Sequence, residues 1–171
     1  MADKERALII SVDPSINHCG LAAIDTNGKY IRSEVIKPPE KLSGPEKLLF
    51  IQSAAGFFVR KVLFSFVPRI EKVVYEEPYF GKNSNIAKIL SQVAAVVCTK
   101  ICEITGVGAV PVSSVSARCK LGLKRDATKS QIRKRIKEIL GQELTQDEAD
   151  ACMVALSAVN KQLKLFGENK K

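Results

Sequence analysis

The sequence predicts an α/β protein in which a five-stranded mixed sheet is flanked by helices. Two observations support this class. The N-terminal part contains three short β-type segments, and the rest of the chain alternates between helical and β-type periodicity. Strands that come first and then alternate with helices are typical of a mixed sheet covered by helices. The 171 residues, 46% hydrophobic and 26% charged, fit one globular domain over residues 1–171.

Composition also limits the class of protein. The ordinary hydrophobic fraction excludes a wholly disordered chain. No stretch reaches the ~20 consecutive apolar residues that a membrane-spanning helix needs. The start of the chain, MADKERALII, has mixed charge and does not fit a secretory signal. We therefore expect no membrane partner and a cytoplasmic location.

The β-type segments are short and bounded by turn residues. The five predicted strands cover residues 7–13, 20–26, 30–36, 70–77 and 107–112. Asn27-Gly28 is a tight-turn signal, so the first three strands are expected to form an antiparallel meander. Pro111 removes a backbone donor from the last strand, which favours the edge of the sheet.

The helical segments begin at capping residues. The predicted helices run from about 43 to 67, from 83 or 84 to 105, from 128 to 140 and from 145 to 165, with a short helical turn near 113–119. Three of them start with a capping box, at Ser43/Glu46, Thr128/Gln131 and Thr145/Glu148. Residues 166–171 form a polar tail beyond the last helix.

The chain is strongly basic, with 27 Lys and Arg against 18 Asp and Glu and a net charge of +9. A basic balance favours nucleic acid as a partner. Nine of the basic residues lie between 118 and 137, with Asp126 opposing them. We expect DNA contacts from Arg118, Lys120, Lys124, Arg125 and Lys129. Residues 133–137 fit a solvated helix face equally well.

Acidic residues stand where a charge is costly. Asp13 ends the first apolar strand, Glu76 and Glu77 end the fourth, and Asp147 and Asp150 share one face of the last helix. Taken singly, each has a structural explanation, such as a turn, a solvated strand end or the acidity of a helix start. Because side chains alternate along a strand, only one of Glu76 and Glu77 faces the cluster.

Together these acids predict a metal centre. Two carboxylates about 4 Å apart repel each other by roughly 4 kcal/mol at an effective dielectric of 20. Three or four of them stay ionised together only with a cation among them. Oxygen ligands suit Mg²⁺ or Mn²⁺ rather than zinc, and such ions support cleavage of phosphodiesters. An acidic centre in a basic protein is therefore expected in a nuclease.

The segment PYFGKNSN, residues 78–85, follows the acidic strand end. Its aromatic pair, Tyr79 and Phe80, stands next to Lys82 and Asn83. Exposed aromatic side chains beside such a centre can stack on bases or insert between them. The alternative is that one aromatic ring completes the hydrophobic core.

Four stretches resemble the RuvC family of Holliday junction resolvases, in the RNase H-like superfamily, and the similarity covers roughly residues 7–160. IISVDPSINHCGLAAID is similar to the first strand of the family with its catalytic aspartate, and YEEPYFGKNSNIAKILSQ to the segment with the catalytic glutamate. SSVSARCKLGLKRDATKSQI resembles the basic DNA-holding segment, and DEADACMVAL the acidic helix.

The resemblance implies an RNase H-like fold and catalytic, metal-binding roles for Asp13, Glu76, Asp147 and Asp150. Alignment on Lys82-Asn83 favours Glu76 over Glu77 and makes Tyr79 the junction-probing aromatic. Lys82, Arg118 and Lys129 fall at phosphate-contacting positions. The implied enzyme is a crossover junction endodeoxyribonuclease. It is a homodimer that uses Mg²⁺, with Mn²⁺ as a substitute and two ions per active site. It needs no small-molecule cofactor, and it nicks opposing strands of a four-way DNA junction.

The chain departs from the family pattern at residues 15–18 and at Pro78, which leaves the preferred substrate open. These departures suggest a divergent member, bacterial or carried by a phage or virus, that acts in the bacterial or host cytoplasm. One alternative is a broader branched-DNA, flap or RNA nuclease of the same fold. Another is a nucleic-acid-binding protein without activity. An actin-like ATPase would need a second domain, for which the chain is too short.

Overall fold

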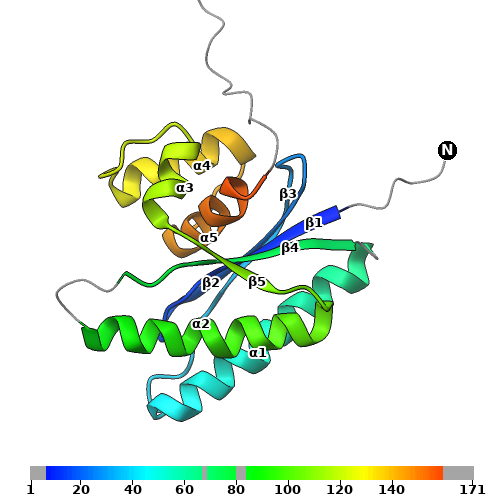
Figure 1. Ribbon diagram of the computed structural model, residues 1–171, viewed down its shortest axis with the longest axis vertical. Coiled ribbons are helices and arrows are strands. Elements are labelled where there is room, and N and C mark those ends of the chain that lie inside the picture. Colours follow the sequence, from blue (N-terminus) through cyan, green and yellow to red (C-terminus); the bar gives the residue numbers. More distant parts are fainter. Residues whose placement is uncertain (1–6, 67–68, 80–83, 160–171) are drawn as a thin grey trace, which may run out of the picture.

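A five-stranded mixed sheet forms the centre of the protein (Figure 1). The structure is a computed structural model that describes residues 7–66, 69–79 and 84–159. The strands are β1 (Ala7–Asp13), β2 (Cys19–Asp25), β3 (Tyr30–Ile36), β4 (Arg69–Glu76) and β5 (Ala109–Val112). Their order is β3-β2-β1-β4-β5, with β1 antiparallel to β2 and parallel to β4. The predicted meander is confirmed, and β5 with its Pro111 lies at an edge.

The turn between β2 and β3 forms as the sequence predicts. The Asp25 carboxylate accepts hydrogen bonds from the backbone N–H groups of Asn27 and Lys29, both at 2.8 Å. Gly28 has a φ of 87°, a left-handed conformation that glycine adopts at no steric cost. This local turn fixes the register of the hairpin.

Helices cover both faces of the sheet. They are α1 (Gly44–Phe66), α2 (Ser84–Thr105), α3 (Ser114–Lys120), α4 (Lys129–Leu140) and α5 (Gln146–Ser157). Helices α1 and α2 lie on one face, and α3, α4 and α5 lie on the other (Figure 1). Alternate residues of β1 divide between the two hydrophobic cores, with Leu8 and Ile10 facing α1 and α2, and Ile9 facing α5. The predicted capping boxes of α4 and α5 are present.

Helix α5 ends at Ser157, which is shorter than the predicted extent to residue 165. The backbone N–H of Ala158 bonds to the carbonyl of Ala155, a tighter pattern that closes the last turn. Two lysines then satisfy the free carbonyls, because Lys120 Nζ donates to Ser157 and Lys72 Nζ donates to Ala158, both at 3.0 Å. The predicted tail at 166–171 lies outside the described residues.

Two helices, α1 over Gly44–Ser65 and α2, are long and apolar enough to cross a membrane by length and composition. The sequence expectation that no segment reaches this limit was therefore wrong. In this fold both helices place part of their apolar residues in the sheet core, through side chains such as Phe58 and Val97. Packing explains only part of their hydrophobicity, because 33% of the residues in each apolar stretch are buried, and large side chains of α1 such as Phe57 and Phe64 are exposed.

Candidate metal centre and DNA-binding surface

Two of the predicted acids lie at the carboxyl ends of neighbouring parallel strands. The last paired residues of β1 and β4 are Val12 and Tyr75, so Asp13 and Glu76 come next on the two strands. Paired strands run about 4.8 Å apart. Both side chains lie on the sheet face covered by α5, because Ile9 of β1 and Val74 of β4 belong to the core on that face.

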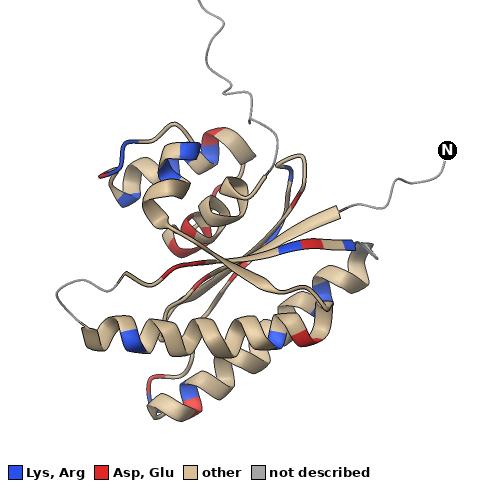
Figure 2. Cartoon of the chain, in the orientation of Figure 1, with Lys and Arg blue, Asp and Glu red and all other residues tan. Residues whose placement is uncertain are grey.

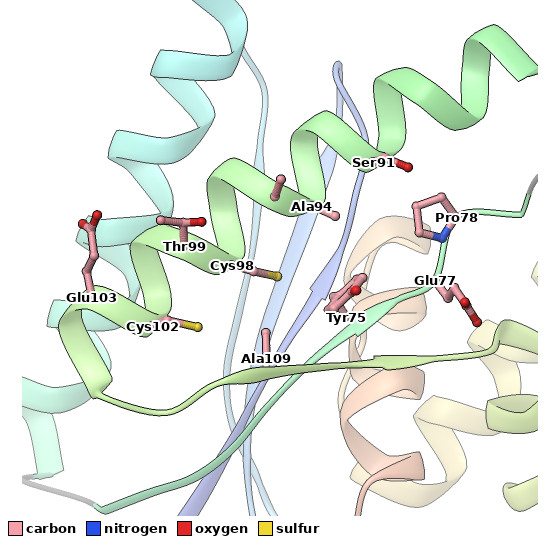
Figure 3. A pocket seen from close by; sticks show the side chains of 11 residues that line it. Tyr75, Glu77, Pro78, Ser91, Ala94, Cys98, Thr99, Cys102, Glu103 and Ala109 are labelled. Atoms are coloured by element: carbon pink, nitrogen blue, oxygen red, sulfur yellow. The ribbon is translucent and has the colours of Figure 1, made fainter.

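Glu77 faces the other side of the sheet. Together with Tyr75 and Pro78 it lines a cavity of about 590 Å³ between α2 and the β4–β5 edge (Figure 3). Cys98 and Cys102 of α2 line the same cavity. The pleat of β4 therefore separates the two glutamates, with Glu76 on the α5 side of the sheet and Glu77 on the α2 side.

Helix α5 brings two further acids to the same place. Its start lies close to β2, because a Cβ added at Gly20 would come within 2.6 Å of the Asp147 carbonyl oxygen and 3.4 Å of the Asp13 Cβ. Gly20 itself pairs with Asp13 in the β1–β2 ladder. A second contact ties the helix to β1, since the buried Ser11 hydroxyl donates to the Ala151 carbonyl at 2.7 Å. The start of α5 is thereby fixed over the end of β1.

The electrostatics of these acids indicate one cluster. Burial raises the pKa of Asp13 well above its ordinary value, and the charges of Glu76, Asp150 and Asp147 raise it further. Burial also raises the pKa of Glu76 and of Asp150. Asp150 adds to the rise at Glu76, and Asp147 adds to the rise at Asp150. The four predicted carboxylates are therefore brought within electrostatic reach of one another.

Glu148 lies between Asp147 and Asp150 in sequence but is held elsewhere. Its carboxylate accepts hydrogen bonds from the Thr145 backbone N–H and hydroxyl, at 2.9 and 2.8 Å. The Ser33 hydroxyl of β3 donates to its other oxygen at 2.9 Å. Glu148 thus caps α5 and ties the helix to the sheet. Of the acidic residues at the start of α5, only Asp147 and Asp150 therefore belong to the cluster.

Two predicted DNA-binding residues lie beside the acids. Lys129, the first residue of α4, lowers the pKa of Asp13, Glu76 and Asp150 by its positive charge, and Arg118 of α3 does so for Glu76 and Asp150. The Arg118 Nη1 donates to the Arg125 carbonyl at 3.0 Å. Its buried Nε has no hydrogen-bond partner in the described part of the chain.

The other predicted basic residues differ in their surroundings. Lys124 and Arg125 are exposed on the loop between α3 and α4. Lys120 is also exposed, but its Nζ is bonded to the C-terminal end of α5, opposite the end that carries the acids. Figure 2 shows Lys and Arg residues gathered on α3, the following loop and α4, with acidic residues at the start of α5 and the end of β4.

The aromatic segment is described only in part. Tyr79 is 86% exposed, so its ring does not complete the core. Phe80, Lys82 and Asn83 lie outside the described residues. The position of Tyr79, three residues after Glu76, leaves an exposed aromatic side chain near the acidic cluster.

The four carboxylates suit a hard divalent cation in donor chemistry and charge. All their side-chain donors are oxygens, which Mg²⁺ and Mn²⁺ prefer. Burial is the main cause of the raised pKa of Asp13, and a cation would also relieve the repulsion from neighbouring carboxylates that adds to it. Over residues 7–66, 69–79 and 84–159, however, no three His, Cys, Asp or Glu side chains are already close enough together to hold a metal ion. The carboxylates therefore lie near one another, but their oxygens do not yet surround a single ion position.

Comparison with protein families identifies the relationship. A model of one family, described as crossover junction endodeoxyribonuclease RuvC, matches residues 9–158. The chain belongs to the RuvC family. Membership confirms the predicted family and the predicted junction-resolving endonuclease, and it implies a metal-dependent nuclease. No match was found among curated proteins.

Solved structures confirm the RNase H-like fold of this RuvC-family protein. RuvC from Thermus thermophilus superposes with a TM-score of 0.69, at 21% identity, over 88% of this chain and 92% of that chain. T. thermophilus RuvC in complex with a Holliday junction substrate gives a TM-score of 0.70, at 21% identity, over 88% and 91% of the two chains. At this level of identity the likeness concerns the fold.

Sequence reasoning missed the residues that hold the site together. Gly20 carried a signal, because a glycine inside a strand often marks a close approach of another backbone. Ser11 and Gln146 carried none that distinguishes them from ordinary polar residues. The Gln146 Nε2 donates to Asp150 Oδ1 at 2.8 Å, a contact that becomes visible only with the helix in place.

Proposed function

We propose that this protein resolves four-way DNA junctions by Mg²⁺-dependent hydrolysis at the cluster of Asp13, Glu76, Asp147 and Asp150. The observation that carries the proposal is the convergence of these four acids from two strand ends and one helix start, with the pKa of three of them raised. The protein has a net charge of +9, yet it brings together carboxylates that repel one another, which costs stability unless a cation binds among them. A site for cations that act on a polyanion explains both features.

In this proposal the four carboxylates hold a pair of Mg²⁺ ions, for which Mn²⁺ can substitute. When bound, such ions activate water and stabilise the charge on the leaving oxygen. The chain itself orients the carboxylates, because three elements hold them. Asp13 is fixed by β1, Glu76 by β4, and Asp147 and Asp150 by α5. Arg118 and Lys129, which carry positive charge beside the acids, bind the phosphates flanking the cut.

The remaining basic and aromatic residues bind the junction around the cut. Lys124 and Arg125 contact the DNA backbone from the exposed loop, and Tyr79 stacks on or inserts between bases at the junction centre. Phe80, Lys82 and Asn83, which follow Tyr79 in the sequence, are proposed to contact the DNA as well. Lys120 contributes mainly by capping α5.

We further propose that the protein acts as a homodimer in the cytoplasm, on branched DNA. A four-way junction has two-fold symmetry, so a two-fold dimer brings one site to each of two opposing strands. The T. thermophilus relative was solved with a Holliday junction substrate, which supports this choice of DNA. Equilibrium sedimentation is expected to give twice the chain mass.

The two neighbouring glutamates of β4 provide a matched test. Glu76→Gln removes a carboxylate of the cluster, and Glu77→Gln makes the same chemical change on the opposite face of the sheet. On an end-labelled four-way junction with a mobile core, Glu76→Gln is expected to abolish cleavage in Mg²⁺ and to keep junction binding. Glu77→Gln is expected to cleave as the parent does. Cleavage by Glu76→Gln at the parental rate would refute the assignment of the cluster.

The same assay separates the substrate alternatives. Paired nicks confined to the junction, lost in EDTA, support a resolvase. Equal cutting of flaps, other branches or RNA would identify a broader nuclease. Salt-sensitive binding of the junction without cutting would identify a binding protein.

A further inference from the structure

Gln146 and Asp150 form a hydrogen-bonded pair at the start of α5. The Gln146 Nε2 donates to Asp150 Oδ1 at 2.8 Å. The residues are one helical turn apart, so their side chains lie on the same face. Asp150 is only 9% exposed, and Gln146 is half-buried. The amide therefore fixes one oxygen of a carboxylate that has little access to water.

The helix start does not need this hydrogen bond for its own capping. Thr145 and Glu148 form a complete capping box around the first turn. Ser33 and Ser11 anchor the same helix to β3 and β1. The Gln146 amide adds no backbone cap to these contacts, and its effect falls on the orientation of the Asp150 carboxylate.

We propose that Gln146 is a positioning residue that holds the Asp150 carboxylate for binding the divalent cation. The inference rests on the proposed function, in which Asp150 is a ligand of the ion. The hydrogen bond to Oδ1 sets the orientation of the carboxylate, and Oδ2, which the amide does not contact, is the oxygen proposed to bind the cation. Partners of this kind orient carboxylate ligands in metal sites, and their loss typically costs about 10–100-fold in metal affinity or activity.

The test measures metal binding by the full-length protein without DNA. Gln146→Met keeps the length of the side chain and removes the donor. Gln146→Asn keeps an amide but shortens the side chain, so that it no longer reaches Asp150. Gln92→Met, at an exposed position of α2, is the matched control. Free Mn²⁺ is quantified by electron paramagnetic resonance during titration of each protein.

Both Gln146 variants are expected to bind Mn²⁺ about 10–100-fold more weakly than the parent, and Gln92→Met is expected to bind as the parent does. The Mg²⁺ concentration for half-maximal cleavage should rise by a similar factor, while cleavage at saturating Mg²⁺ recovers. Thermal unfolding in EDTA tests whether each variant is folded. Unchanged Mn²⁺ affinity in the folded variants would overturn the inference.

Asp150→Asn separates this inference from the proposed function. If Asp150→Asn loses Mn²⁺ binding and cleavage while the Gln146 variants keep both, the positioning role alone is wrong. If Asp150→Asn itself binds Mn²⁺ and cleaves as the parent does, the proposed role of the cluster is wrong as well. Loss of Mn²⁺ binding and cleavage in Asp150→Asn, together with weaker Mn²⁺ binding in both Gln146 variants and unchanged binding in Gln92→Met, supports both.

Discussion

Replacement of Gly20 by alanine tests whether the site depends on the close approach of α5 to the sheet. The added Cβ would lie 2.6 Å from the Asp147 carbonyl oxygen and 3.2 Å from the Ala151 Cβ. Both atoms belong to α5, and the nearer one is backbone, which cannot rotate away. To restore ordinary contact at 3.4 Å, the start of the helix must move by about 0.8 Å.

This displacement has two expected costs. Overpacking of a well-packed region typically costs about 1–3 kcal/mol of stability. For a chain of this size, each kcal/mol lowers the melting temperature by about 2–4 °C. The same movement carries Asp147 and Asp150 away from Asp13 and Glu76. A misplacement of about 1 Å in a catalytic constellation costs on the order of 10²-fold in rate.

The assay is single-turnover cleavage of a four-way junction in Mg²⁺, at a temperature well below the unfolding transition. Gly20→Ala is expected to cleave about 10²-fold more slowly than the parent and to bind the junction with similar affinity. Gly56→Ala is the control, because its added Cβ meets nothing nearer than 3.4 Å and lies between α1 and α2. A folded Gly20→Ala that cleaves at the parental rate would refute this account of the site geometry.

Three further predictions follow from the same structure. Tyr79→Ala, which removes an exposed ring, should slow cleavage much more than it weakens junction binding; a loss confined to binding would make the residue an affinity contact. Asp13→Asn should stabilise the metal-free protein at pH 7, because burial and neighbouring carboxylates raise the pKa of Asp13 and favour its protonated form. This gain should vanish below the unfolded-state pKa of about 3.9, and thermal melts in EDTA from pH 3 to pH 8 would detect it; a gain that is independent of pH would contradict this cause. Lys120→Ala should lower stability by about 1 kcal/mol through loss of a carbonyl contact, with no change in the salt dependence of junction binding. Lys124→Ala should instead reduce the slope of that salt dependence by about 1, and the reverse pattern in salt titrations would show that the two roles were misassigned.

Much of the fold follows from local signals in the sequence. The alternation along β1 and β4 places Asp13 and Glu76 on one face of adjacent strands, and the same alternation sends Glu77 to the other face. Capping boxes at Thr128 and Thr145 fix the starts of α4 and α5. These signals depend only on residues close together in the chain, so they can be recognised in the sequence without knowledge of the tertiary structure.

The end of α5 was not predictable in the same way. The periodicity of the sequence continues past Ser157, but Lys72 and Lys120 reach its last carbonyls from β4 and α3. The contact of Lys120 with α5 was hidden in the same way, because the basic residues around it in sequence give no sign of the helix end that it reaches in space.

The sequence by itself determined the elements, the faces of the strands and the acids at their ends, because backbone periodicity and capping are short-range properties. Only the tertiary structure decided how closely those acids approach. That distance depends on Gly20 meeting Asp147 and on Ser11 meeting Ala151, a pair 140 residues apart in the chain. Such contacts arise when two finished elements pack against each other. A glycine inside a strand signals a close approach but does not identify the partner, and Ser11 carries no such signal.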